Sequence, residues 1–308
     1  MEQVLVAGGT GLIGSELSKM LVSKGYKVVV LSRKPKAPEN GIEYAVWNVE
    51  KREIDEQSVA NSEFIINLAG ANIAEKRWTK KRKAEIQDSR SDAALLLADT
   101  IRKFPEKVKA IISASAIGFY GADNKKNGIV PFEENDPPFL DFLGTTCSLW
   151  ERSMETVLKA NKRLVLLRTG IVLSTKGGAF KEFLKPLKFG LATIMGSGKQ
   201  IVSWIHIEDI CRMYLYAMEN EDMHGPYNAV SPYIVSNKKM VLEIANQLRG
   251  KFYIPVHVPE SVLETVLGEM SIEVLKSTSV SADKIRKHGF QFLYPTIGGA
   301  VKNLLGKE

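Results

Sequence analysis

A cluster of glycines near the start of the chain is the first feature that could do chemistry. The run is Gly8-Gly9-Thr10-Gly11-Leu12-Ile13-Gly14, and it lies between an apolar segment and apolar residues at helical spacing. Such a strand–turn–helix context is typical of a loop that binds a dinucleotide. Gly8 permits a tight turn, Gly11 lets the backbone approach a pyrophosphate, and Gly14 lets the helix pack on the strand. Unpaired N–H groups at the helix start favour phosphate. We expect a dinucleotide site; a purely structural turn is the alternative.

The end of the second predicted strand indicates which dinucleotide binds. This strand ends Leu31-Ser32-Arg33-Lys34, without the Asp or Glu that holds the ribose hydroxyls of NAD. An arginine fork matches a phosphate group. We therefore expect Ser32 and Arg33 to select NADP, unless this is an exposed basic loop that merely lacks the acid.

Two hydroxyl groups follow the fifth predicted strand. Ser115 and Tyr120 lie just past its carboxyl end, where ligands bind in open α/β sheets. Together they could polarise a carbonyl and pass a proton. A tyrosine that only caps a loop is an equal alternative. His206 could also be an acid or base, but a packed histidine near a helix start is the better expectation.

The elements that would position these residues alternate between strand and helix. Apolar strands are predicted at 4–7, 27–31, 43–47, 64–68, 108–113 and 164–168, with helices at 12–25, 80–104 and 149–160. This alternation predicts a Rossmann-type α/β fold, a doubly wound parallel sheet, over residues 1–172. Residues 173–308 are expected to form a smaller, mainly helical substrate region. Its helices are predicted at 206–218, 238–248, 260–267, 281–288 and 296–305.

Composition excludes several classes of protein. The 308 residues are 44% hydrophobic and 25% charged, which is typical of a globular chain. Cys147 and Cys211 form no CxxC pair, so we expect no metal site, no disulfide framework and a reducing, cytoplasmic location. No apolar run approaches the roughly 18 residues of a membrane span, and we see no signal peptide at the start. We expect no membrane partner.

The net charge of +7 is a weak indication of nucleic-acid binding. Its densest basic run is Lys76–Lys83, which is typical of a solvated helix start and would alternatively suit an anionic ligand. We expect no nucleic-acid partner. A small-molecule substrate is expected, and a homodimer stays open because oligomeric state cannot be read from the sequence.

Several motifs resemble the extended short-chain dehydrogenase/reductase family. They are the glycine loop, Asn67-Leu68-Ala69-Gly70, Arg168-Thr169-Gly170-Ile171-Val172, and the segment from Gly196 to Asp209. Residues 115–121, Trp150-Glu151 and the tail motifs 267–270 and 289–296 resemble an epimerase-family branch with a small C-terminal conserved domain, here residues 238–308. The resemblance implies that Ser32, Arg33, Leu68, Ala69, Gly70, Glu85, Arg90 and Val172 hold the cofactor. Glu85 and Arg90 are spaced i, i+5, which is poor for a mutual salt bridge.

One departure from the wider family concerns its catalytic Tyr-x-x-x-Lys pair. The sequence contains no such pair, and Cys147 and Glu151 stand at the matching place. A carboxylate beside an acid raises the pKa of that acid instead of lowering it. Glu151 could still accept hydrogen bonds from ribose hydroxyls, whereas Cys147 is better explained as a small buried residue.

Taken together, these residues predict an atypical NADP(H)-dependent oxidoreductase or nucleotide-sugar epimerase-like enzyme. Its substrate would be a small carbonyl or alcohol whose identity the sequence does not reveal. The alternative is a catalytically silent NADP-binding regulator or scaffold, a role that the resemblance links loosely to cell division.

Overall fold

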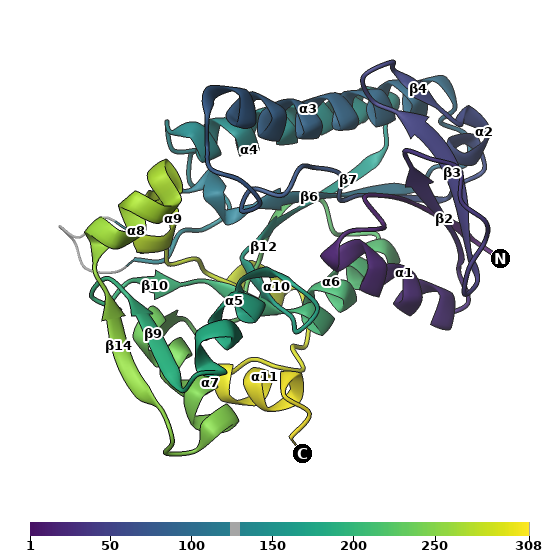
Figure 1. Ribbon diagram of the computed structural model, residues 1–308. Coiled ribbons are helices and arrows are strands. Elements are labelled where there is room, and N and C mark those ends of the chain that lie inside the picture. Colours follow the sequence, from purple (N-terminus) through teal and green to yellow (C-terminus); the bar gives the residue numbers. More distant parts are fainter. Residues whose placement is uncertain (124–129, 308) are drawn as a thin grey trace.

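A computed structural model describes residues 1–123 and 130–307. Its centre is an eight-stranded sheet of order β12-β7-β6-β5-β1-β2-β3-β4, which runs parallel except for β4 (Figure 1). The Val, Ile and Leu side chains on both faces of the central strands are buried, as is typical of parallel sheets. The strands are β1 (Gln3–Ala7), β2 (Lys27–Ser32), β3 (Ile42–Asn48), β4 (Glu53–Ile54), β5 (Phe64–Asn67), β6 (Ala110–Ala116), β7 (Arg163–Thr169) and β12 (Gly225–Ala229).

Helices cover both faces of this sheet. Figure 1 shows α3 (Lys80–Lys103) and α4 (Phe142–Glu155) on one side and α1 (Leu12–Ser23) and α6 (Ile207–Glu219) on the other. Short helices α2 (Glu56–Ala60), η1 (Ile117–Phe119) and η2 (Thr156–Ala160) complete the connections. The predicted doubly wound Rossmann-type fold is confirmed.

The structure differs from the sequence-based expectation in the start of one helix and in the boundary of the sheet domain. Helix α4 begins at Phe142 instead of Leu149, because the side chain of Asp141 accepts a hydrogen bond from the Gly144 amide and caps the helix there. Strand β12 and helix α6 follow residue 172, yet β12 pairs with β7 and α6 packs on α1. The sheet domain therefore includes segments that follow residue 172, its expected C-terminal boundary.

The remaining elements build a smaller region around a second apolar core. Helices α5 (Gly178–Leu187), α7 (Asn237–Arg249) and α11 (Ile297–Leu304) enclose it together with β9 (Leu191–Met195). Short strand pairs were not predicted here: β9 with β14 (Ile254–Val258), β8 (Ile171–Leu173) with β11 (Trp204–His206), and β10 (Ile201–Val202) with β13 (Val235–Ser236). They escape periodicity analysis because they are only two to five residues long.

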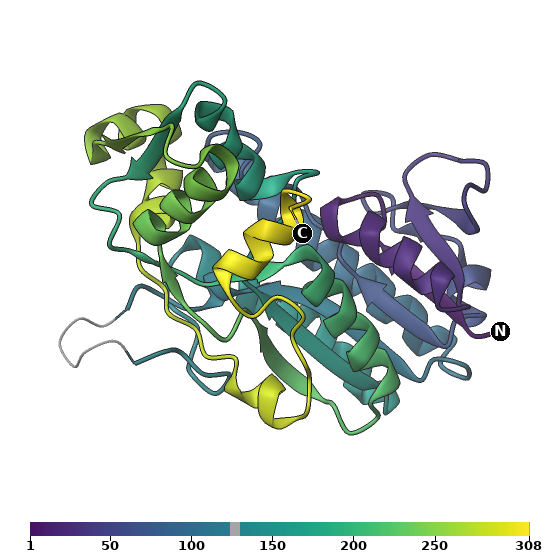
Figure 2. The ribbon, with the colours of Figure 1, turned by 90° about the horizontal axis from the view of Figure 1, so that it is seen from below.

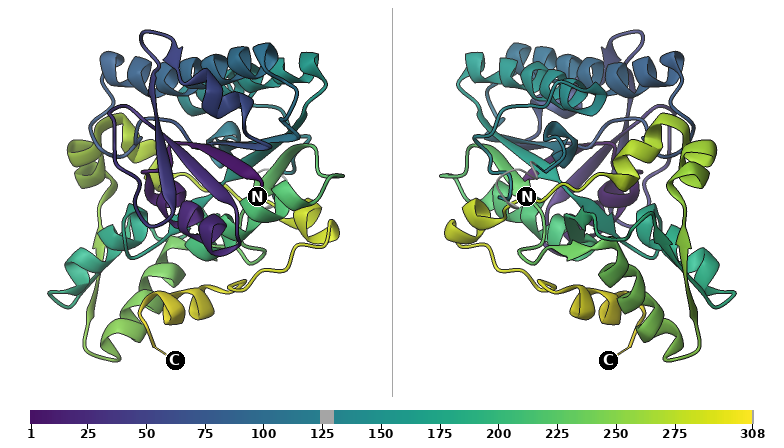
Figure 3. Two further views of the ribbon diagram at one scale, coloured as in Figure 1. Left: turned by 90° about the vertical axis from the view of Figure 1, so that its right-hand side faces the viewer. Right: turned by 90° about the vertical axis from the view of Figure 1, so that its left-hand side faces the viewer.

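The C-terminal tail ties the two regions together. After α8 (Glu260–Leu267), η3 (Gly268–Met270) and α9 (Ser271–Leu275), the chain returns across the sheet domain through α10 (Asp283–Lys287), as Figures 2 and 3 show. The buried carboxylate of Asp209 accepts hydrogen bonds from the Leu293 and Tyr294 amides, at 2.7 and 2.9 Å. Asp123 likewise accepts hydrogen bonds from the tail, from the hydroxyl groups of Ser277 and Ser279 and from the backbone amide of Ser279.

The basic run Lys76–Lys83 contacts the same C-terminal helices. Arg77 donates to the carbonyl of Thr265, and Lys83 pairs with Glu269. Arg82 is buried and pairs with Glu75 and Glu85. Three of the six basic residues in this run therefore make contacts within the chain. Among the helices of the described residues, none is long and apolar enough to cross a membrane.

Candidate functional site

The glycine turn between β1 and α1 leaves no room for a Cβ atom at Gly8, Gly9 or Gly14, and at Gly8 and Gly14 the neighbouring atoms belong to the backbone. Gly8 adopts a φ of +78°, and a Cβ atom there would lie 2.6 Å from the backbone of Leu68. A Cβ atom at Gly14 would lie 2.3 Å from the carbonyl oxygen of Gly8. These close approaches hold the turn, the helix start and the Leu68 segment together.

Gly11 differs, because a Cβ atom there would meet only the carbonyl oxygen of Gly8, at 3.3 Å, within the described part of the chain. Gly11 is also the N-cap of α1 and offers no side chain to the first N–H groups. By contrast, Asp141 and Ser236 cap the amides of α4 and α7. An exposed turn with uncapped amides fits a diphosphate, which those amides can bind.

Further residues predicted for the cofactor continue from this turn. Asn67 accepts a hydrogen bond from the amide of Ala69 and so shapes the turn Leu68–Gly70 beside Gly8. Gly70 lies against the side chain of Arg90. On the other side, Gly178 lies close to both the side chain of Leu12 and the carbonyl oxygen of Val172. The structure brings these predicted residues to the carboxyl edge of the sheet.

Arg90 is a half-buried cation. Its guanidinium lies 5.2 Å from the ring of Trp150 and donates to the carbonyl of Ile86, at 2.8 Å. Within the described residues no carboxylate pairs with it, and burial lowers the pKa of Arg90. Glu85 pairs with Arg82 instead, at 2.7 Å, so the expectation that Glu85 and Arg90 do not pair with each other is confirmed.

Ser32 and Arg33 lie at the carboxyl end of β2, next to β1 and its glycine turn. Ser32 is buried, and its hydroxyl accepts a hydrogen bond from the Lys34 amide, at 3.4 Å. Arg33 is exposed and makes no ion pair among the residues described. An unpaired guanidinium is thus available to an external anion.

Cys147 and Glu151 lie on one face of α4, enclosed against the sheet. Burial, followed by the charge of Glu151, raises the pKa of Cys147 to about 12. The Glu151 carboxylate forms a bidentate pair with Arg168 of β7, with both N–O distances 2.8 Å. It also accepts the hydroxyl hydrogen of Ser115, at 2.6 Å. Its oxygens are therefore occupied by protein groups, and ribose would have to share them.

Ser115, Arg168 and Asn228 form a polar row across the neighbouring strands β6, β7 and β12. They are register partners, so their side chains share one face of the sheet. Tyr120 joins this row: its hydroxyl donates to Asn228 at 2.8 Å and accepts from Arg168 at 2.9 Å. Glu134 accepts a hydrogen bond from the Asn228 amide at 2.8 Å.

The raised pKa values of Tyr120 and Arg168 keep both side chains protonated at neutral pH. Burial raises the pKa of Tyr120 to about 12, although Arg168 opposes the shift. Burial works against the charge of Arg168, but the Glu151 carboxylate outweighs it and raises the pKa of Arg168. Burial also raises the pKa of Glu134. Ser115 and Tyr120 are 3% and 0% exposed, so the catalytic roles assigned to them stay predictions.

The roles of Arg168, Glu134 and Asn228 in this network were not predicted from the sequence. Arg168 could have been predicted, because it lies at the end of an apolar strand and a buried charge there needs a partner of opposite charge. Glu134 and Asn228 carried no such signal, since both follow irregular segments whose path is not periodic.

His206 is a packed histidine at a helix start, as expected. It is 2% exposed, its Nδ1 accepts the amide hydrogen of Glu208, and its ring contacts Tyr294 with 4.1 Å between the centroids. Burial lowers the pKa of His206 to about 4.

This lowered pKa predicts a loss of stability in acid. An unfolded chain protonates His206 near pH 6.5, whereas the folded protein leaves it neutral down to about pH 4. The free energy of unfolding should therefore fall as pH decreases from about 6.5 to about 4. His206→Asn keeps a capping acceptor without this titration, so urea unfolding at several pH values should show a shallower decline. An equal decline in both proteins would refute the assignment.

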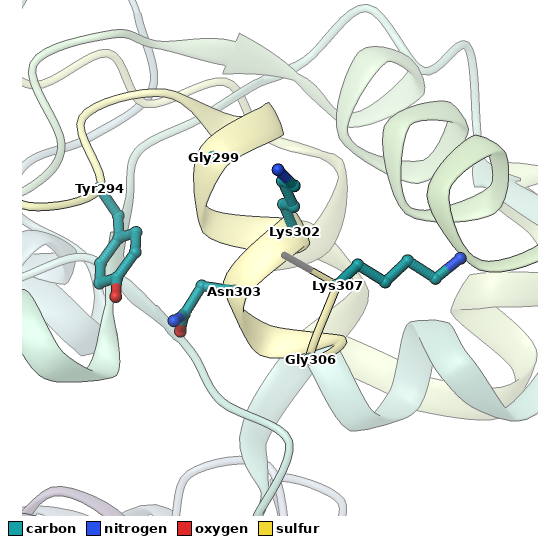
Figure 4. A pocket seen from close by; sticks show the side chains of 6 residues that line it. All are labelled: Tyr294, Gly299, Lys302, Asn303, Gly306 and Lys307. Carbon is teal, nitrogen blue, oxygen red and sulfur yellow. The ribbon is translucent and has the colours of Figure 1, made fainter.

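A hollow of about 520 Å³ lies at the end of α11, away from the glycine turn. Figure 4 shows Lys302 and Lys307 extending away from Tyr294 and Asn303, so its polar groups do not converge on one ligand. In the described residues no group of three or more His, Cys, Asp or Glu side chains could hold a metal ion.

Comparison with known proteins places this geometry in a family. Residues 4–231 match the NAD dependent epimerase/dehydratase family, and residues 258–304 match a domain of unknown function, DUF1731. Epimerase family protein YfhF of Bacillus subtilis is 34% identical over 303 residues, which cover 98% of this chain and 97% of that protein. Human epimerase family protein SDR39U1 is 30% identical over 307 residues, which cover 98% and 99%.

Solved structures of related proteins have the same overall fold. The crystal structure of human SDR39U1 (isoform 2) with NADPH matches with a TM-score of 0.84 and 29% identity, covering 99% of this chain and 100% of that one. UDP-glucose 4-epimerase from Thermotoga maritima, crystallised with UDP-glucose, matches with a TM-score of 0.76 and 19% identity, covering 99% of each chain, and supports the fold alone. The resemblance found in the sequence is thereby confirmed: the chain belongs to the NAD dependent epimerase/dehydratase family.

Proposed function

We propose that this protein binds NADP(H) and transfers hydride between that coenzyme and a small carbonyl or alcohol. The observation that carries the proposal is an exposed, unpaired Arg33 at the end of β2, beside an uncapped glycine turn. A guanidinium there suits the phosphate that distinguishes NADP from NAD. The NADPH bound to human SDR39U1 supports the same coenzyme.

The residues of the chain divide between binding and positioning. The amides at the start of α1 would bind the diphosphate. Ser32 and Arg33 would bind the phosphate on the adenosine half. Leu68–Gly70 and Val172 would contact the coenzyme on either side of the turn. A bound nicotinamide supplies hydride chemistry. Arg90, as a partly desolvated cation next to Gly70, would attract the anionic ligand.

Ser115 is the group we propose for proton handling. Its hydroxyl hydrogen is committed to Glu151, so its oxygen is left to accept a hydrogen bond from a substrate hydroxyl. Tyr120 has no exposed atoms, and we propose that it positions Arg168. The ion pair between Arg168 and Glu151 would hold Ser115 in place.

Arg33→Ala is expected to remove the preference for NADPH over NADH. Loss of a charge-assisted contact to phosphate corresponds to about 1.5–3 kcal/mol, or roughly 10- to 150-fold in the dissociation constant for NADPH. NADH, without that phosphate, should bind with unchanged affinity. Coenzyme fluorescence titrations measure both constants, with Lys34→Ala as the matched control. If wild-type protein binds NADH as tightly as NADPH, the selection of NADP is refuted.

A specific observation favours a second function, that of a silent NADP-binding regulator. Cys147 and Glu151 replace the family's catalytic pair, and both are enclosed. Oxidation of bound NADPH, followed with a panel of carbonyl compounds and UDP-sugars, separates the two. Turnover with any member supports the enzyme. Tight NADPH binding without any turnover favours the regulator.

A further inference from the structure

A turn of the C-terminal region lies directly against the glycine turn. Residues 174–178 lead from β8 into α5, and we call them the strap. A Cβ atom at either Gly177 or Gly178 would lie 3.4 Å from the side chain of Leu12, the first residue of α1. Gly178 also lies close to the carbonyl oxygen of Val172. The strap therefore contacts the same turn whose amides are available to a diphosphate.

An ion pair holds the strap on α1. The ammonium group of Lys176 donates to both carboxylate oxygens of Glu16, each at 2.7 Å. These two side chains are 57% and 25% exposed, so solvent weakens the pair without abolishing it. Burial works against the charge of Glu16, but Lys176 and Lys19 outweigh it and lower the pKa of Glu16. The carboxylate is therefore charged at neutral pH.

The strap can leave α1 without stranding an unpaired charge. Lys19 lies 3.4 Å from Glu16 in the same helix, so Glu16 keeps a partner when Lys176 moves away. The hydroxyl of Ser174 accepts the amide hydrogen of Lys176 at 3.2 Å, which preserves the shape of the strap itself. Gly178 has a φ of +69°, and two adjacent glycines give the backbone freedom to rotate where the strap meets α5. We therefore expect opening to cost little free energy.

The C-terminal region also contacts the sheet domain on the other face of the sheet. Helices α1 and α3 cover opposite faces, as Figure 1 shows. At the start of α3, Arg77 donates to the carbonyl of Thr265 and Lys83 pairs with Glu269. The C-terminal region thus spans the carboxyl edge of the sheet from one face to the other. A coenzyme at that edge would lie beneath this span, and the strap is the part that touches the glycine turn.

We propose that the strap closes over the bound coenzyme and controls how fast the coenzyme leaves. This inference rests on the proposed function, because it takes the glycine turn as the diphosphate site. Release requires the strap to open, so the observed release rate is the rate from the open state multiplied by the fraction of open molecules. Breaking the pair between Lys176 and Glu16 raises that fraction.

Two substitutions that change the charge in opposite directions test the strap. Glu16→Gln removes a negative charge near the diphosphate site, whereas Lys176→Met removes a positive one. If charge alone retained the coenzyme, the first would slow release and the second would speed it. The strap predicts that both speed release by about two- to fivefold, as loss of a partly exposed ion pair does. The double variant should match the single variants, because the same pair is lost in all three.

Stopped-flow fluorescence measures this rate. Full-length protein loaded with NADPH is mixed with an excess of NADP⁺, and the decay of the fluorescence of bound NADPH gives the release rate. Lys185→Met is the matched control and should leave the rate unchanged, because Lys185 pairs with Glu182 within α5, at 2.6 Å. The substituted side chains lie at the surface, so the thermal midpoint should not change.

A covalent link between the strap and α1 gives the opposite test. In the variant Glu16→Cys/Lys176→Cys, a short reducible bifunctional thiol reagent can join the two positions, since both native cysteines are buried. Linking the protein after NADPH is loaded should slow release by at least about tenfold, because the open state is no longer populated. Reduction of the link should restore the rate of the unlinked double variant.

The strap and the proposed function fail in distinguishable ways. Unchanged release rates in both single variants, opposite changes in the two, or unaltered release from the linked protein would each overturn the strap while NADPH still binds. Wild-type protein that does not bind NADPH would overturn the proposed function, and the strap with it.

Discussion

Replacing Gly11 with alanine is expected to weaken NADPH binding by at least about thirtyfold, or about 2 kcal/mol. The added methyl group meets one protein atom, the Gly8 carbonyl oxygen at 3.3 Å, and otherwise occupies the space in front of the uncapped amides of α1. A diphosphate can then no longer approach those amides. Coenzyme fluorescence titration measures the loss, and the thermal midpoint should change little.

Gly14→Ala is the matched control for this prediction. Its Cβ atom would lie 2.3 Å from the Gly8 carbonyl oxygen, so α1 must shift and the protein itself should lose stability. The two variants therefore separate binding from folding within one turn. Equal NADPH affinity in wild-type and Gly11→Ala protein would show that the turn does not bind the diphosphate.

Replacing Arg168 with methionine should lower the free energy of unfolding by about 3–5 kcal/mol. The substitution leaves the Glu151 carboxylate buried without its countercharge. It also removes the hydrogen bond that the Tyr120 hydroxyl accepts from Arg168. An unpaired charge in such surroundings is strongly destabilising. Urea denaturation at neutral pH measures the change.

The double variant Glu151→Leu/Arg168→Met supplies the control. With both charges gone, the desolvation cost disappears, and much of the lost stability should return. Additive losses would indicate that the two side chains do not act as a pair. A small loss in the single variant would show that solvent reaches Glu151, contrary to its 6% exposed side chain.

The sheet domain could be predicted from sequence because its signals are local. Apolar runs such as Val4–Ala7 and Lys27–Leu31 are long enough to identify as buried strands, and the glycines of Gly8–Gly14 indicate the turn that joins a strand to a helix. Helix α3 was predicted to within one residue because Thr79 caps it and Lys103 ends its apolar pattern. The family motifs then led to the correct family.

The rest depends on contacts between distant segments. Strand β12 reads as loop because Gly225 and Pro226 begin it, and only its pairing with β7 makes it a strand. Likewise Glu151 appeared free to bind ribose, since nothing in α4 indicates that Arg168 of β7 lies beside it. The pairing of β14 with β9 could not be predicted either, because the two strands are far apart in the sequence.

Recognition of a phosphorylated dinucleotide by the first turn and Arg33 is the central claim. Isothermal titration calorimetry of the purified wild-type protein with NADPH, and separately with NADH, tests it most directly. We predict saturable binding of one NADPH per chain, with much weaker heats from NADH. The absence of binding heat from both coenzymes, at several temperatures, would contradict the central claim.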